Sequence, residues 1–224
     1  MVQQLHLAHT PANLALYVAV YRDVENVTFL REQLLAGNAE FEYAFIDASM
    51  VVSTKHALAA AFRAINDYMN DRLKSRNIHS EIVFSLSPNN NVPVLTFLPL
   101  QIGEAFRRFG VSETTRDLLV MKVATTPQIT LESVSQHLST HIQGNEVPLD
   151  DATFQQTADF DRIRKVYKLS TTLAPRTKKS GPVPKVDGAV NGDAALTNGD
   201  KANFNETRNL EVQILGLMAL RGAT

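Results

Sequence analysis

Residues 74–91 read Lys-Ser-Arg-Asn-Ile-His-Ser-Glu-Ile-Val-Phe-Ser-Leu-Ser-Pro-Asn-Asn-Asn, and after an apolar interruption residues 102–110 read Ile-Gly-Glu-Ala-Phe-Arg-Arg-Phe-Gly. The short apolar run at residues 82–86 predicts a buried strand, which a basic loop precedes and a polar turn at residues 87–91 follows. The second piece predicts a short basic helix that ends at Gly110. This combination of strand and helix indicates a domain of the α+β class.

The composition bounds the class of protein. At 224 residues, with 44% hydrophobic and 20% charged side chains, the chain fits one medium-sized globular domain with extensions. No apolar run approaches the ~20 residues that span a bilayer, and the N-terminus lacks the layout of a signal peptide, so we expect a soluble intracellular protein. The absence of cysteine excludes disulfides, thiolate metal sites and cysteine nucleophiles. With a net charge of -1, any nucleic-acid binding must depend on a local basic patch.

Hydrophobic periodicity predicts the other elements of the domain. Short apolar runs at residues 14–20, 45–47 and 117–123 are typical of strands. Apolar residues three and four apart predict helices that begin near residues 26, 54, 131 and 154, and Ser53 or Thr54 can cap the second of these. Together they predict a single α+β domain over residues 1–173, with a small mixed β-sheet flanked by helices.

The chain changes in character after residue 173. Residues 174–205 are rich in Gly, Pro, Asn, Asp and Lys and hold too little apolar surface to offset the entropy of ordering, so we expect a disordered linker. Its basic cluster of Arg176, Lys178 and Lys179 is either a nuclear import signal or a chance feature of a basic tail. Residues 206–224 predict an amphipathic, tethered C-terminal helix that docks on the domain, on a partner, or on both.

No known enzyme motif occurs in the sequence: there is no phosphate-binding loop with its lysine, no nucleophile elbow, no zinc-protease helix and no kinase triplet. His137 and His141 stand four residues apart on a predicted helix, a spacing that lets two imidazoles reach one metal ion. No carboxylate accompanies them on that face, so we favour solvated histidines and predict no metal and no cofactor. We expect a non-catalytic protein, because an enzyme would require a pocket of perturbed acids or histidines that the sequence does not announce.

Basic residues gather around the quoted stretch. If they converge, they form a cationic groove that can bind an RNA backbone, with Phe106 or Tyr68 available for base stacking. The alternative is that they solvate the outer faces of helices, and interleaved carboxylates such as Asp67 and Glu104 weaken the patch. The candidate RNA-binding residues are Lys55, His56, Arg63, Arg72, Lys74, Arg76, Arg107 and Arg108.

Five short pieces of the chain carry a family resemblance when they are taken together. They are Ser-Glu-Ile at 80–82, Leu-Ser-Pro-Asn-Asn-Asn at 86–91, Glu-Ala-Phe at 104–106, Phe-Gly at 109–110 and Arg-Lys-Val-Tyr-Lys-Leu-Ser at 164–170. In this order they resemble a fungal member of the TPRKB-like (CGI-121) family, a subunit of the KEOPS (EKC) tRNA-modification complex. Residues 92–101 depart from the family, which joins the turn directly to the helix, so we interpret them as an insertion, either genuine or from an error in the gene model.

The resemblance implies a non-catalytic subunit that binds the N-terminal lobe of the complex's PRPK-type atypical kinase and stimulates it. It also implies that the subunit recruits tRNA through its single-stranded 3′ acceptor end, so that the separate KEOPS catalytic subunit, an indirect partner, forms threonylcarbamoyladenosine (t6A). Localisation to nucleus and cytoplasm, a role in telomere maintenance and the absence of a membrane partner are further expectations. A kinase adaptor without RNA contact is the alternative. In the family the kinase contact involves the C-terminal helix, which singles out Leu210, Ile214, Leu217 and Met218.

Overall fold

The computed structural model describes residues 1–88, 94–169 and 198–220, with side chains described from Pro99 onward in the second range and from Glu206 onward in the third. The strands in these ranges are β1 (Gln3–Leu5), β2 (Leu16–Arg22), β3 (Ala44–Asp47), β4 (Leu118–Val123) and β5 (Asn145–Val147). The α-helices are α1 (Val27–Leu35), α2 (Thr54–Met69), α3 (Ile78–Ser85), α4 (Val94–Phe109), α5 (Leu131–His141), α6 (Asp151–Thr157), α7 (Phe160–Tyr167) and α8 (Asn198–Leu220). Two short 3₁₀ helices, η1 (Ala39–Phe41) and η2 (Ala48–Met50), flank β3.

Strand β2 lies in the middle of an antiparallel sheet. One of its edges pairs with β4, which places Leu16 opposite Val123, and β4 pairs in turn with β3. Its other edge is shared by β1 and β5. The α+β class is therefore confirmed, but the described pairings are all antiparallel rather than mixed. The connection from β2 through α1 to β3 resembles a parallel unit, yet β4 enters between the two strands in the opposite direction.

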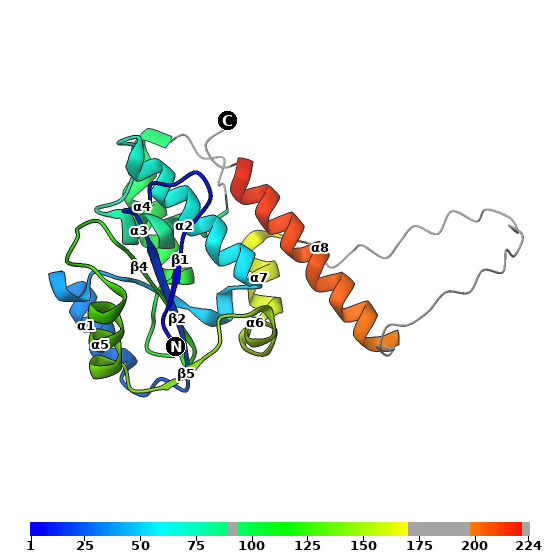
Figure 1. Cartoon of the computed structure of the whole chain (residues 1–224). Coiled ribbons are helices and arrows are strands. Elements are labelled where there is room, and N and C mark those ends of the chain that lie inside the picture. The colour runs from blue at the N-terminus through cyan, green and yellow to red at the C-terminus, as the bar shows by residue number, and fades with distance from the viewer. Residues whose placement is uncertain (89–93, 170–197, 221–224) are drawn as a thin grey trace, which may run out of the picture.

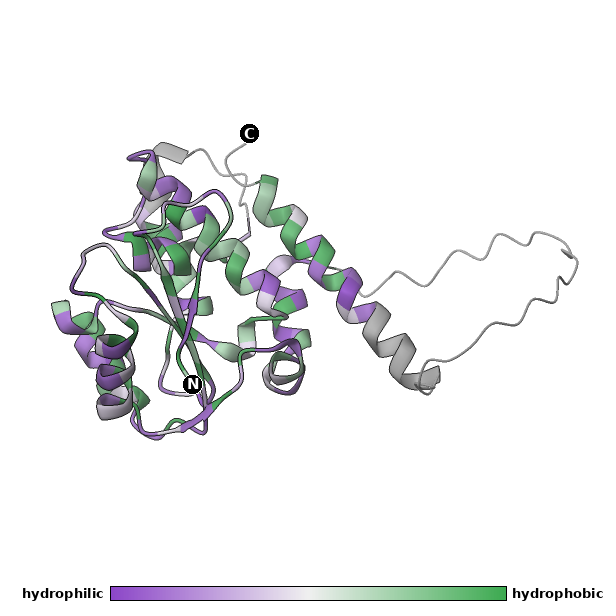
Figure 2. Ribbon diagram, viewed as in Figure 1, coloured by the Kyte–Doolittle hydropathy of each residue, from purple (hydrophilic) through white to green (hydrophobic). Residues whose placement is uncertain are grey.

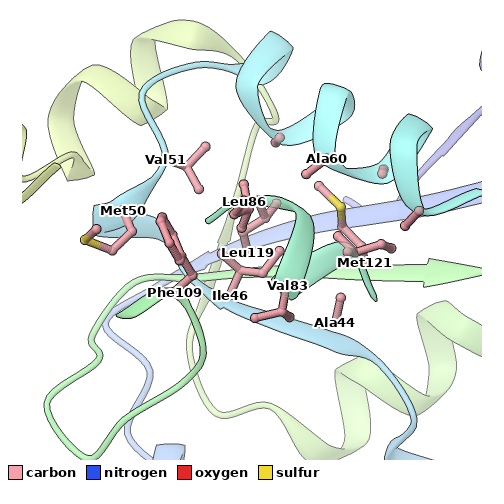
Figure 3. Packing of buried hydrophobic residues seen from close by; sticks show 14 of the residues in the cluster. Ala44, Ile46, Met50, Val51, Ala60, Val83, Leu86, Phe109, Leu119 and Met121 are labelled. Carbon is pink, nitrogen blue, oxygen red and sulfur yellow. The ribbon is translucent and has the colours of Figure 1, made fainter. Parts of the chain in front are cut away.

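Alternating side chains on the strands supply two apolar cores, one on each face of the sheet. Val18 and Val20 face the core formed with α2, α3, the C-terminal part of α4 and helices α6 to α8. Tyr17 and Tyr21 face the other core, formed with α1 and α5. The sheet is thus sandwiched between two layers of helices (Figure 1), and Figure 3 shows how Phe109, Ile46 and Leu119 meet in the first core.

Most of the elements expected from periodicity are confirmed. The predicted strands correspond to β2, β3 and β4, and the predicted helices to α1, α2, α5 and the pair α6 and α7. Ser53 caps α2, because its Oγ accepts a hydrogen bond from the backbone N–H of His56 at 3.1 Å. Within the ranges that the structure describes, no helix is both long and apolar enough to cross a membrane.

The strand predicted at residues 82–86 is wrong: this segment belongs to helix α3. Asn77 caps the helix by accepting a hydrogen bond from Ser80 N at 2.8 Å, and the helix ends before Leu86. The helix is buried on nearly all sides between α2, β3 and β4, so its sequence is apolar without the alternation of an exposed face. A short apolar run of this kind fits a buried strand and a buried helix equally well.

Two expected boundaries fall differently in the structure. Residues 94–101 of the interpreted insertion form the N-terminal half of α4, with Pro99 inside the helix, rather than a loop. Helix α8 begins at Asn198, so residues 198–205 are helical where the linker was expected to continue. The remainder of the expected linker, with its basic cluster at residues 176–179, lies outside the described residues.

Candidate partner-binding surfaces

Helix α8 packs along α2 through one apolar face. Leu210, Ile214 and Met218 are buried in the core beneath it, and Ile214 has no exposed surface. Three polar contacts fix the helix along its length: Ser53 Oγ donates to Glu211 at 2.6 Å, Arg63 Nη1 donates to the carbonyl of Met218 at 2.6 Å, and Arg164 pairs with Glu206 at 2.5 Å. The helix is thus an integral part of the domain surface, with its position set by both packing and hydrogen bonds.

The opposite face of α8 is apolar and open to solvent. No charged residue occurs between Val212 and Leu220. Val212 is 62% exposed and Leu220 is 59% exposed, and the intervening Gly216 and Ala219 are also exposed. Figure 2 shows the apolar residues that follow one another along this part of the helix. Because a contiguous apolar patch on a surface marks an interaction site, we call this surface the outer face of α8.

A groove of about 520 Å³ runs between α2 and α8, next to the outer face of α8. Its apolar wall is formed by Phe62, which is 41% exposed, together with Leu215 and Ala219. Its charged end is formed by Arg63, Asp67, Arg72 and Lys74. Asp67 lies 3.4 Å from Arg72 and 3.9 Å from Arg63, so one carboxylate serves two guanidinium groups.

A second cavity, of about 510 Å³, opens between α1, η1, the start of α3 and the end of α4. We call it the arginine pocket, because Arg31 lines it from α1, Arg76 from the loop before α3 and Arg107 from α4. Its aromatic lining consists of Phe41, Tyr43 and Phe106. Polar groups that can form hydrogen bonds also line it, namely Asn38, Asn77, Ser80 and Ser112.

The loop that carries Arg76 is held in place by the buried carboxylate of Glu81. Glu81 Oε2 accepts hydrogen bonds from Lys74 N at 3.0 Å, Ser75 N at 2.8 Å and Ser75 Oγ at 2.7 Å. On the facing side, Gly37 adopts a φ of +67°, and a Cβ atom there would lie 3.2 Å from Arg76 Nη1. The arginine therefore lies against a glycine that leaves room for its guanidinium group.

The floor of the arginine pocket rests on a buried lysine of the sheet. Lys122 Nζ lies 4.6 Å from the centre of the Tyr43 ring and donates to the carbonyl of Glu42 at 2.5 Å. Burial lowers the pKa of Lys122, and burial raises the pKa of Tyr43 to about 12, so the phenol keeps its proton at neutral pH. Tyr43 Oη lies 3.1 Å from His137 Nδ1. The ring of Tyr43 is buried and packs against Lys122 and against the ring of His137, so it is a fixed part of the pocket wall and its faces are already covered.

A model of the family described as kinase binding protein CGI-121 matches residues 21–222 of the chain. The chain belongs to this family. It is 51% identical over 223 residues to the EKC/KEOPS complex subunit cgi121 of Aspergillus terreus, with 100% of the chain and 98% of that relative covered. Subunits of the same name from Aspergillus fumigatus and Coccidioides immitis are each 46% identical, over 223 and 224 residues, with 100% of the chain and 98% and 99% of the relatives covered. The family predicted from the sequence is confirmed.

In this CGI-121 family member, three of the four predicted kinase-contact residues lie on the face of α8 that packs on its own domain. Leu210, Ile214 and Met218 are buried against their own domain, so a partner cannot contact them while α8 stays docked, whereas Leu217 is half-buried and keeps part of its surface accessible. The three- and four-residue spacing correctly indicates an apolar helix face, but a helix presents such a face to its own core in the same way as to a partner. The surface of α8 that remains accessible consists of the outer face and the exposed part of Leu217.

The predicted RNA-binding residues are divided among several places rather than brought together. Arg76 and Arg107 line the arginine pocket, whereas Arg63, Arg72 and Lys74 line the groove. Lys55 is exposed in the first turn of α2, about 21 Å along the helix axis, at 1.5 Å per residue, from Met69, after which the loop with Arg72 and Lys74 begins. Arg108 pairs with Glu104 at 2.9 Å, and Glu104 also pairs with Arg107.

His56 is the predicted RNA contact that the structure contradicts. Its side chain is fully buried, its Nε2 lies 2.9 Å from Tyr167 Oη, and its Nδ1 accepts from Val52 N at 3.3 Å. Burial lowers its pKa to about 3, so it carries no charge that could attract phosphate. Conversely, Arg31 lines the arginine pocket and was not predicted, because it lies in another helix, far from the quoted stretch in sequence.

The histidine pair on α5 has partners that differ from those of a metal site. His141 Nδ1 lies 2.8 Å from the carbonyl of His137, which fixes its proton on that nitrogen. His137 uses its Nδ1 toward Tyr43, and burial lowers its pKa. No group of three or more His, Cys, Asp or Glu side chains in the described ranges could hold a metal ion.

Proposed function

We propose that the chain is a non-catalytic subunit of an EKC/KEOPS complex. It binds and stimulates the atypical kinase of the complex and recruits tRNA through the 3′ acceptor end for t6A modification. Membership of a kinase-binding family and the names of the relatives support the first part of the proposal. Nuclear and cytoplasmic localisation belongs to the same proposal.

The outer face of α8 is the observation that carries the kinase proposal. The other face of the helix is already buried, so the domain gains nothing by leaving Val212 and Leu220 open to water. The nearby wall of Phe62 extends the apolar surface onto α2. A partner that covers this surface removes apolar area from water without disturbing the fold, and we assign the kinase to it.

The arginine pocket supports the RNA part of the proposal. Single-stranded nucleic acid is bound by cationic side chains that follow the backbone and by aromatic rings on which bases stack. Arg31, Arg76 and Arg107 supply the first, and Phe106, the half-exposed aromatic residue of the pocket lining, supplies the second. Arg76 takes part in no ion pair with the residues that the structure describes, so it can neutralise a phosphate without first losing a carboxylate partner.

A kinase adaptor without RNA contact is the second candidate function. It is favoured by the carboxylates at the rim of the pocket, because Glu113 pairs with Arg31 at 3.4 Å and Glu104 pairs with Arg107. Exposed ion pairs of this kind contribute about 0–1 kcal/mol, so a phosphate can displace them. The two candidates therefore differ in a measurable way, namely in direct tRNA binding.

The kinase assignment is tested with two variants of exposed apolar residues on opposite sides of the domain. Val212→Glu places a carboxylate in the outer face, and Leu131→Glu places one in the first turn of α5. Burying an unpaired carboxylate in an apolar interface costs several kcal/mol, so we expect Val212→Glu to weaken kinase binding more than tenfold and Leu131→Glu to leave it unchanged. Equal binding by both variants would remove the outer face from the interface.

The RNA assignment is tested by tRNA binding as a function of salt. We expect Arg76→Glu to weaken binding, Lys55→Glu to have little effect, and wild-type affinity to fall steeply with salt because counterions are released from the phosphates. A tRNA trimmed of its acceptor end should bind more weakly than intact tRNA. Equal binding of the two tRNAs would exclude recognition of the acceptor end, and no binding of either would favour the adaptor.

A further inference from the structure

We infer that the groove between α2 and α8 receives an acidic side chain of the protein partner that covers the outer face of α8. In this arrangement Arg72 and Lys74 are specificity determinants for that protein and not RNA contacts. The inference rests on the proposed kinase docking and deepens it, because it names the chemistry that the partner must present: apolar side chains next to a carboxylate.

The charges of the groove leave a net positive end beside an apolar wall. Its charged lining consists of Arg63, Arg72 and Lys74 against Asp67, which is three cations and one carboxylate, or a net charge of +2. Arg63 is already directed to the Met218 carbonyl and to Asp67. Arg72 has a side chain that is 60% exposed, and Lys74 is exposed and forms no ion pair within the described ranges. The two residues can therefore accept a further carboxylate with little rearrangement.

The surroundings of the groove favour a protein over RNA. A strand of RNA would bring a phosphate at every nucleotide, and the surface that continues from the groove is the uncharged outer face of α8. Phosphates above Val212 and Ala219 would lose water without gaining a hydrogen bond.

The loop between α2 and α3 divides its cations between the two sites. Arg72 is drawn toward α2 by Asp67, and its backbone N–H donates to the Asp67 carbonyl at 2.8 Å. Two residues later, Glu81 binds the backbone of Lys74 and Ser75, and beyond this point Arg76 lies against Gly37 in the arginine pocket. Cations within four positions of one another in the sequence thus line two different sites, the groove and the arginine pocket.

The test measures two ligands with two charge-reversal variants of the full chain, one for each site. The kinase of the same EKC/KEOPS complex and intact tRNA are titrated against wild type, R72E/K74E and R107E, at low and at physiological salt. We expect R72E/K74E to slow kinase association about tenfold at low salt, to reduce its salt dependence, and to leave tRNA affinity within twofold of wild type. R107E should show the converse pattern.

The controls separate this inference from the function on which it rests. Lys74→Glu alone removes no ion pair of the described structure, so its kinase association remains informative if the double variant melts lower. Wild type that fails to bind the kinase would overturn the proposed function itself. Wild type that binds, with R72E/K74E associating equally fast, would overturn only the acidic contact, and a tRNA loss in R72E/K74E as large as that in R107E would assign the groove to RNA.

Discussion

The packing of α8 predicts that two apolar residues two positions apart have opposite roles. Ile214 is fully buried beneath the helix, and Val212 is 62% exposed on the outer face. Truncating a buried isoleucine to alanine removes apolar burial and leaves a cavity, which costs about 2–5 kcal/mol. Truncating an exposed residue away from special features changes stability by about 0.5 kcal/mol or less.

We therefore expect Ile214→Ala to lower the free energy of unfolding by about 2–5 kcal/mol, which is about 4–20 °C in melting temperature for a domain of this size. Val212→Ala should melt within about 2 °C of wild type. The measurements are thermal melting and urea unfolding, both followed by circular dichroism, with the two variants in parallel. The loss in Ile214→Ala should appear in the midpoint at constant slope, because the surface exposed on unfolding is nearly unchanged.

Two results would contradict this account of α8. Ile214→Ala with wild-type stability would show that α8 does not pack on the domain in solution. A larger loss for Val212→Ala than for Ile214→Ala would show that the helix is docked through its other face. Either result would also return Ile214 to the list of accessible residues that a kinase can contact.

Three further predictions follow from the buried polar groups and from α4. Burial lowers the pKa values of His56 and His79 to about 3, so below pH 6.5 the unfolded chain binds protons that the folded chain does not. We expect the two histidines together to lower the free energy of unfolding by about 4 kcal/mol at pH 5, measured as a fall in the urea midpoint between pH 7 and pH 5. A urea midpoint that rises on acidification would contradict this prediction. Glu81→Gln should destabilise the protein by about 1–3 kcal/mol in the same assay and weaken tRNA binding, because the loop that carries Arg76 loses a charged acceptor of three hydrogen bonds. Unchanged tRNA affinity would show that the position of this loop does not affect RNA binding. Deleting residues 92–101 should raise solubility and melting temperature without loss of kinase binding, because Ala105 and Phe109, which anchor α4 in the core, lie beyond the deletion. A lower melting temperature would show that the segment contributes to the stability of the domain.

The sequence was sufficient to predict those elements whose apolar spacing fits either a helix or a strand but not both. Strand β2 and helices α2 and α5 each face a core on one side or lie buried within it, and their patterns were read correctly. Helix α3 was misread because burial on nearly all sides removes the polar face that would reveal a period of 3.6 residues. The Asn77 cap with Glu81 in the first turn was the available signal for a helix. Strands β1 and β5 are three residues long, too short for periodicity to detect.

The candidate sites were less accessible to sequence reasoning because they depend on direction in space. The apolar spacing of Ile214 and Met218 correctly indicated a docking face on α8, but only the packing on α2 shows that the domain itself occupies that face. Likewise, Arg72 and Arg76 are neighbours in the chain, yet the hydrogen bonds of Asp67 and Glu81 turn them toward different surfaces. Arg31 joins Arg76 through the tertiary fold, which no local pattern predicts.

Hydrogen–deuterium exchange of the full chain, with and without the kinase of its complex, tests the central claim most directly. The claim is that the outer face of α8 and the adjacent wall of α2 form the kinase-docking surface. It predicts slower exchange on kinase binding in peptides that cover residues 212–220 and the part of α2 around Phe62, with α1 and α5 on the other side of the sheet unchanged. Protection confined to α1 and α5, or the absence of any change in α8 when the kinase is bound, would contradict it.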